Sequence, residues 1–193
     1  KLVDFVLRGG GLWILAGPNI EESFYQNWQG GDGPVVPIKL GKMNLPENGV
    51  RVAQGTFDHP VLRIFKEAAG DDLAEGVVLG YRESAGLVSG AQAAARFADG
   101  EIFMATRAYG HGRVVVTTTG LDARMGSLPA RPSFVPLVHE MTNWLAGGKG
   151  VELNVKASWS PTLSLPSGGG LRATYLRGKN GEKGEMLSRV DSA

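Results

Sequence analysis

The chain has 193 residues, of which 42% are hydrophobic and 20% are charged, and this length is enough for one domain of about 150 residues and part of a second. Its formal net charge is +1 and it has no basic cluster, which argues against nucleic acid as the main partner. It has no cysteine, which excludes disulfides, thiolate metal sites and a cysteine nucleophile.

The first residues have the pattern of a helix. Leu2, Phe5 and Val6 have the spacing of the last turns of an amphipathic helix, and three glycines follow. Since these turns lack a beginning, we expect part of an α/β domain to precede Lys1. No apolar run approaches the ~20 residues that are needed to span a bilayer.

A strand, a turn and a helix are predicted next. Residues 12–16 (LWILA) form a short apolar run between glycines. Asn19 is predicted to cap a helix that carries Phe24 and Trp28 on one face. A turn between a strand and a helix binds an anion or carries a nucleophile in some folds. The alternative is a turn that only connects the two elements, and the fold alone favours that role.

The following stretch is less regular. Residues 29–55 are rich in glycine and proline with little periodicity, which predicts a long loop over the carboxyl-terminal edge of the sheet. Asp58-His59-Pro60 predicts the start of a short helix. Residues 77–81 and 90–97 predict further strands.

Residues 99–147 carry the clearest pattern. Residues 102–107 and 113–119 predict two paired strands around a glycine-rich hairpin turn. The second strand is apolar on both faces, and we expect it to be central and covered on each side by helices. Residues 133–145 predict an amphipathic helix, with Ser133 as its N-cap.

The C-terminal residues differ in character. Val151, Leu153 and Val155 alternate with polar residues, as in a strand. We therefore divide the chain into an α/β domain over residues 1–148 and the start of a β-sandwich-like module over residues 149–193. For the first domain we predict a flavodoxin-like fold, with a mostly parallel sheet that includes one antiparallel hairpin.

Four segments carry a resemblance to a known family. They are FVLRGGGLWILAGP, HPVLRIF, FADGEIFMATRAYGHGRVVVTTTGLDARMGSLP and SFVPLVHEMTNWLAGG. The chain resembles the class I glutamine amidotransferase-like domain of BatA-type (aerotolerance-regulator-like) bacterial membrane-anchored proteins, which often carry a von Willebrand A domain. The resemblance implies a parent protein in the bacterial cell envelope, with this domain outside the cytoplasm.

The resemblance also implies where a catalytic site would lie. Active amidotransferases of this fold need a cysteine on the turn after a central strand, and a histidine and a glutamate after a later strand. The corresponding places here are residues 16–18 and 117–122, and neither carries the required residue. Because glycine and alanine cannot attack a carbonyl and threonine has no basic nitrogen, we predict no catalytic residues.

A ligand pocket is predicted at the carboxyl ends of the strands, where open α/β sheets bind ligands. Its candidate residues are Gly17, Asn19, Thr119, Asp122 and Arg124. As an alternative, Asp122 and Arg124 only pair with each other and order their loop.

The histidines show no common site. His59, His111 and His139 are scattered along the chain, and the segment after His139 lacks the second histidine of a zincin motif. We therefore predict that each of them faces solvent or caps an element. No metal and no cofactor are predicted.

These observations predict a non-catalytic binding or scaffolding domain of a bacterial cell-envelope protein. The expected partners are other protein domains of the same chain or of an envelope complex, and the membrane is reached only through a missing anchor. The first alternative is a hydrolase or carbohydrate-active enzyme with a rebuilt site near Asp122, Arg124 and His111. The second is a structural oligomerisation domain. The sequence leaves the ligand and the oligomeric state open.

Overall fold

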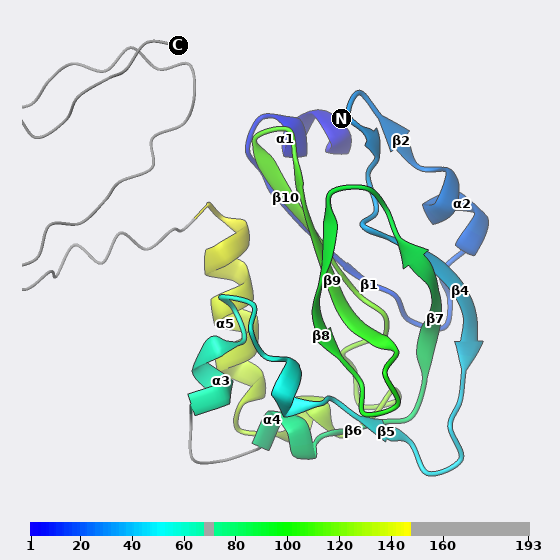
Figure 1. Cartoon of the computed structure of the whole chain (residues 1–193), viewed down its shortest axis with the longest axis vertical. Coiled ribbons are helices and arrows are strands. Elements are labelled where there is room, and N and C mark those ends of the chain that lie inside the picture. Colours follow the sequence, from blue (N-terminus) through cyan, green and yellow to red (C-terminus); the bar gives the residue numbers. More distant parts are fainter. Residues whose placement is uncertain (68–71, 148–193) are drawn as a thin grey trace, which may run out of the picture. The chain divides into compact units, whose positions relative to one another are not determined.

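The computed structural model describes residues 1–67 and 72–147 (Figure 1). The β-sandwich-like module predicted over residues 149–193 lies outside these ranges.

A four-stranded sheet lies at the centre of the described residues. Its order is β1 (Gly11–Leu15), β10 (Gly112–Thr117), β9 (Ile102–Tyr109) and β8 (Ala91–Arg96). β1 runs parallel to β10, whereas the pairs β10–β9 and β9–β8 are antiparallel. The structure is therefore a mixed α/β fold with one parallel pair.

The prediction of a mostly parallel, flavodoxin-like sheet is wrong in its strand directions. β8, β9 and β10 follow one another through short turns, and a short turn can join only antiparallel neighbours. Apolar residues on both faces of β10 show that both faces are covered, but they do not determine the direction of the adjacent strands.

The predicted hairpin is confirmed, with a tighter turn than expected. Tyr109 pairs with Gly112, so the loop consists of Gly110 and His111 alone. Gly110 has a φ of +57°, and a positive φ at the first loop residue is a feature of type II′ turns, where glycine avoids the steric penalty of a side chain.

Residues 29–55 contain strands, so the prediction of a long loop is wrong. The elements are β2 (Gln29–Gly30), β3 (Gly33–Pro34), β4 (Ile38–Asn44) and β5 (Val50–Arg51). The start of β4 alternates between buried and exposed residues, as a strand with one covered face does. The alternation is limited to the first three residues of β4, and the glycines and prolines around it hid this pattern in the sequence.

β4 and β5 pair with two strands of the segment before β8. β4 pairs antiparallel with β7 (Tyr81–Leu87), and β5 pairs antiparallel with β6 (Val77–Val78). The strand predicted over residues 77–81 therefore contains all of β6 and the first residue of β7. The strand predicted over residues 90–97 is confirmed as β8.

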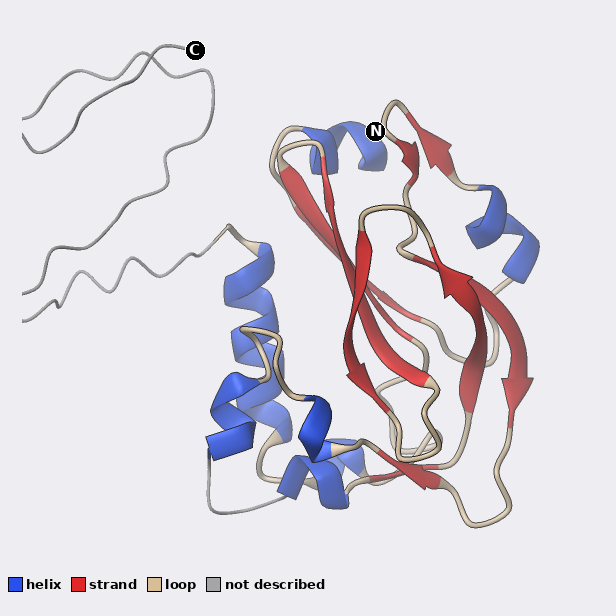
Figure 2. Ribbon diagram, in the orientation of Figure 1, coloured by secondary structure: helices blue, strands red, loops and turns tan. Residues whose placement is uncertain are grey.

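Both faces of β10 are buried, as predicted, although helices alone do not cover them. Val115 packs with buried side chains of α5 (Phe134–Leu145) in one hydrophobic cluster. Val114 and Val116 belong to a second cluster, with α1 (Leu2–Leu7) and the start of β4. Figure 2 shows α5 on one side of the sheet together with the short helices of residues 63–67 and 72–75.

The remaining helices are short. They are α2 (Glu22–Asn27), α3 (Arg63–Glu67) and α4 (Asp72–Glu75), with 3₁₀ turns η1 (Gln54–Thr56) and η2 (Leu128–Ala130). Among the described residues, no helix is long and apolar enough to cross a membrane.

Two predicted helix caps differ from expectation. The N-cap position of α2 is held by Glu21, so Asn19 lies in the preceding loop. Ser133 holds the N-cap position of α5 as predicted, but its side chain makes no capping hydrogen bond. Its backbone N–H instead donates to Asp72 Oδ2 at 2.8 Å, so a carboxylate from α4 satisfies an N–H group at this terminus.

The packing of α5 can be tested at two neighbouring positions. Leu137 is 0% exposed and Val135 is 73% exposed. We expect Leu137→Ala to lower the free energy of unfolding by about 2–5 kcal/mol, because it removes buried methyl groups and leaves a cavity. Val135→Ala, the control, is expected to change it by no more than about 0.5 kcal/mol. Urea denaturation measures both, and equal losses would contradict the described face of α5.

Candidate functional site

The turns after β1 and β10 lie side by side, because the two strands are parallel and in register up to Leu15 and Thr117. A Cβ placed on Gly17 would lie 3.9 Å from the Cα of Gly120. Thr119 is buried, and its Oγ1 donates to the Gly80 carbonyl at 2.7 Å. The structure therefore brings Gly17 and the Thr119–Gly120 turn together. Asn19 is exposed on its loop.

Asp122 and Arg124 contact each other, as the alternative interpretation expects. Asp122 Oδ1 accepts hydrogen bonds from the Arg124 backbone N–H at 2.8 Å and from its Nε at 3.2 Å. These bonds from the Arg124 side chain and backbone hold the pKa of Asp122 below its ordinary value. Both side chains are largely exposed, so the pair orders the loop after β10 and contributes little to stability.

His111 does not reach this loop. It lies in the hairpin turn before β10, whereas Asp122 follows the other end of the same strand. The six residues of β10 separate the two ends by about 20 Å at ~3.3 Å per residue. The structure therefore does not bring His111 together with Asp122 and Arg124.

A buried arginine that the sequence analysis missed organises the turn after β1. Arg82, in β7, is 5% exposed. Its Nη2 donates to the Pro18 carbonyl at 2.7 Å, and its Nη1 donates to Glu22 Oε1 at 2.5 Å. Longer bonds, at 3.4 Å, reach the carbonyls of Gly17 and Ile20.

The guanidinium of Arg82 therefore satisfies carbonyls of the turn, and its charge is paired with Glu22. In the sequence, Arg82 lies among polar residues and has the pattern of an exposed strand position. Every residue that Arg82 contacts on this turn lies at least 60 positions away in the sequence, so no local pattern could reveal these contacts.

A cavity of about 420 Å³ lies between the segment around η1 and strand β8. Its walls come from two stretches of the chain, residues 55–60 and residues 92–96. The lining residues are Gly55, Thr56, Asp58, His59, Pro60, Gln92, Ala93, Ala94, Ala95 and Arg96.

His59 is the buried titratable group of this cavity, so the prediction that it faces solvent is wrong. The other part of that prediction, a capping role, agrees with the hydrogen bond that its Nδ1 accepts from the Val61 backbone N–H. Its side chain is 6% exposed. The ring packs edge-on against Trp144 of α5, with 4.9 Å between ring centroids. Arg113 lies over the same indole, 4.8 Å from its centroid. Burial, with a smaller effect of the Arg113 charge, lowers the pKa of His59 to about 4.

The neighbours of His59 determine which ring nitrogen carries the proton. The Val61 backbone N–H donates to Nδ1 at 3.3 Å, which assigns the ring proton to Nε2. The adjacent carboxylate, Asp58, pairs with Lys66 at 2.5 Å. His59 thus presents a neutral hydrogen-bond donor at neutral pH and has no carboxylate partner in these contacts.

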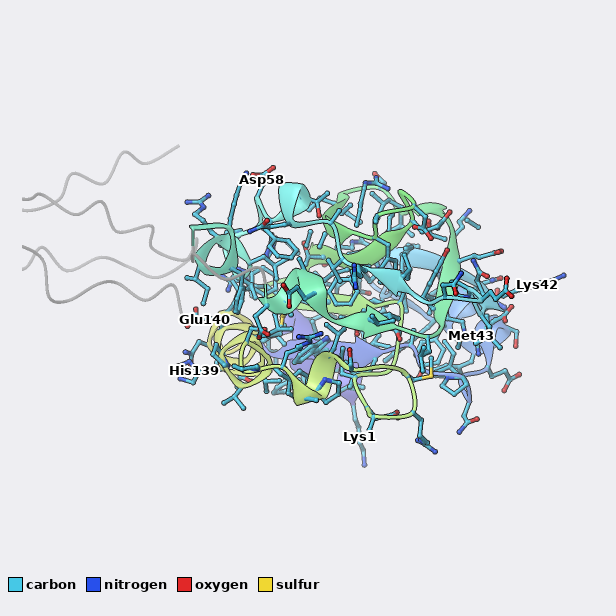
Figure 3. The ribbon with its side chains drawn as sticks, turned by 90° about the horizontal axis from the view of Figure 1, so that it is seen from below. Lys1, Lys42, Met43, Asp58, His139 and Glu140 are labelled. Carbon is cyan, nitrogen blue, oxygen red and sulfur yellow. The ribbon has the colours of Figure 1, made fainter. Side chains whose placement is uncertain are left out.

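The other histidines lie elsewhere. His111 and His139 are exposed, and Figure 3 shows Asp58, beside His59, and His139 at different edges of the domain. Within residues 1–67 and 72–147, no group of three or more histidine, aspartate or glutamate side chains is placed to hold a metal ion.

Comparisons with known proteins bear on the fold. No protein-family model matches the chain, and no curated protein matches it. The chain is similar to the solved structure of Cytoplasmic Protein STM3548 from Salmonella typhimurium, with a TM-score of 0.56, 16% identity and 75% of this chain covered. It is also similar to Cytoplasmic Protein STM1381 from Salmonella typhimurium LT2, with a TM-score of 0.49, 17% identity and 76% coverage.

The chain spans 58% of the length of STM3548 and 57% of the length of STM1381. At 16% identity the likeness to STM3548 shows a shared fold and carries no activity to this chain.

These findings overturn the resemblance to BatA-type membrane-anchored proteins. STM3548, whose fold the chain shares, is named as a cytoplasmic protein and not as a BatA-type or membrane-anchored protein. The resemblance is therefore wrong. The extracytoplasmic location in the cell envelope, which rested on it, is wrong for the same reason. The four segments on which the resemblance rested consist mainly of glycines and apolar residues, and such residues indicate a fold more than they indicate a family.

Arg82 can be tested by removing its charge. We expect Arg82→Met to lower the free energy of unfolding by about 2 kcal/mol or more, because it leaves the Pro18 carbonyl and the Glu22 carboxylate without their partner. Hydrogen exchange should also become faster in the backbone of residues 16–22. The matched control Arg124→Met, at an exposed pair, should change stability by no more than about 0.5 kcal/mol. A similar small change for Arg82→Met would refute the role given to Arg82.

The pKa of His59 predicts a pH dependence of stability. Its folded pKa of about 4 lies below the ordinary 6.5, so the unfolded chain takes up the proton first. The contribution is complete above pH 6.5 and is lost as the pH falls toward 4. Over this range we expect wild-type protein to lose on the order of 3 kcal/mol relative to His59→Gln. Urea denaturation at each pH measures this, and His111→Gln, the exposed control, should follow the wild type.

Proposed function

We propose that the described residues form a non-catalytic binding domain. The observation that carries the proposal is the state of the charged groups near the carboxyl ends of β1 and β10. Arg82 is bonded to carbonyls and to Glu22, and Asp122 is bonded to Arg124. Groups engaged in this way are poorly placed to move a proton to or from a substrate.

The cavity beside β8 supplies the binding site in this proposal. Its volume of about 420 Å³ lies within the ~300–1,000 Å³ that is usual for ligand sites. Its walls combine alanine and proline with the His59 ring and the side chains of Asp58, Gln92 and Arg96. His59 contributes a hydrogen-bond donor rather than a base, since its Nδ1 accepts from Val61.

The alternative of a rebuilt hydrolytic site has less support. It needs Asp122, Arg124 and His111 together, and the length of β10 separates His111 from the other two. The alternative of an oligomerisation domain stays a prediction.

The proposal is tested by a search for turnover. Purified wild-type chain is incubated with chromogenic esters, glycosides and γ-glutamyl anilides, together with His59→Gln and Asp122→Asn. We expect all three proteins to give the rate of buffer alone, because no base is available in either place. A rate above buffer that His59→Gln or Asp122→Asn abolishes would refute the non-catalytic role.

A further inference from the structure

The outer edge of β8 forms one wall of the cavity. β8 is the last strand in the order of the four-stranded sheet, so β9 occupies one edge, and no named strand within residues 1–67 and 72–147 pairs with the other. Residues 92–96 of this strand line the cavity. An uncovered strand edge presents backbone N–H and C=O groups that another chain can bind.

The chain itself pairs with the end of this edge. The Ala53 N–H donates to the Arg96 carbonyl at 2.8 Å, and the Ala98 N–H donates to the Arg51 carbonyl at 2.8 Å. Val52 and Phe97 form an antiparallel bridge between them. Residues 51–53 thus act as a short strand beside the end of β8.

This pairing ends at η1, where the chain turns away. The Arg96 N–H then donates to Thr56 Oγ1 at 3.0 Å, so a side chain takes the place of the next backbone partner. Farther along, residues 92–95 make no backbone hydrogen bond outside the β8–β9 ladder to any described residue. The cavity begins where the covering segment stops.

The walls suit a second backbone. Ala93, Ala94 and Ala95 line the β8 side. The side chains of Ala94 and Ala95 are buried in the core, so they do not extend over the backbone edge of β8. Gly55 and Pro60 line the opposite side. Register shifts at Ala95 interrupt the ladder with β9, so the usable edge is short, on the order of four residues or 13 Å.

We infer that the cavity binds an extended peptide segment of a partner protein, which adds to β8 as a short antiparallel strand and continues the path of residues 51–53. The inference deepens the binding role proposed above and rests on it. Backbone hydrogen bonds to β8 supply the attachment in this inference.

The test starts from a peptide library on phage, randomised over about eight positions so that it exceeds the usual strand of ~5–6 residues. Selection uses the full chain, and the enriched peptide is synthesised with a fluorescent label. We expect saturable binding by fluorescence anisotropy and enrichment of β-branched residues. Failure to enrich any peptide overturns the inference.

Gly55→Trp locates the site. No atom lies within 4 Å of a Cβ built on Gly55, and its φ is not positive, so a side chain can begin there without a clash, at a residue that lines the cavity. Gly31→Trp is the matched control, because Gly31 has the same freedom and does not line the cavity. We expect Gly55→Trp to weaken binding about tenfold or more and Gly31→Trp to leave it unchanged. Equal effects overturn the inference, provided both variants keep the wild-type thermal midpoint.

N-methylation of the peptide distinguishes strand addition from binding through side chains alone. Along an added strand, alternate N–H groups face β8. Methylating one alternate set should therefore weaken binding about tenfold or more, while methylating the other set leaves it unchanged. Equal affinities for both methylated peptides overturn the inference.

The outcomes separate the two proposals. A chain without turnover that binds no peptide contradicts the strand-addition inference and leaves the non-catalytic role standing. Turnover that His59→Gln abolishes contradicts the proposed function whatever the peptide result. Self-association in sedimentation that Gly55→Trp abolishes assigns the edge to a second copy of this chain and overturns the partner peptide.

Discussion

Burial of β10 on both faces is the constraint on which the rest of the described structure depends. Val114 and Val116 pack with α1 and β4, whereas Val115 packs with α5. Removing each of these side chains from water stabilises the fold by about 1.5–3 kcal/mol, so the chain must bring a covering element to each face. β1 and β9 satisfy the backbone of β10 on its two edges. The position of β10 therefore determines where α1, α5 and the β4–β7 pair lie.

The same burial sets the polar chemistry at the end of β10. The strand continues into buried threonines, and buried hydroxyls need partners. Thr118 Oγ1 donates to the Ile102 carbonyl and Thr119 Oγ1 donates to the Gly80 carbonyl, both at 2.7 Å. Arg82 does the same for the turn after β1. The requirements of packing thus account for these groups without a substrate.

The sequence predicted the elements whose signal is local. The 102–107 and 113–119 strands and the helix after Ser133 have strong periodicity and a glycine turn, and they form as expected. The prediction of strand direction was wrong because an apolar run indicates that a strand is buried but not which way its neighbours run. Contacts between residues far apart in the sequence were not predicted either. Arg82 pairs with Glu22, 60 positions away, and His59 packs against Trp144 of a distant helix. The spacing of residues within one segment does not reveal such contacts. The role of Arg82 and the burial of His59 were therefore missed.

The open edge of β8 contrasts with the closed end of β10. Proteins usually cover, twist or charge an edge strand, because an exposed one invites unwanted pairing. Here residues 51–53 cover one end and register shifts distort the ladder, which leaves only a short stretch beside the cavity. The side chains of Ala94 and Ala95 are buried in the core, so this stretch meets the cavity with its backbone edge. Peptide N–H and C=O groups bind strongly but do not exchange protons with a substrate at neutral pH. An open stretch built from such groups is therefore suited to holding an extended chain through its backbone.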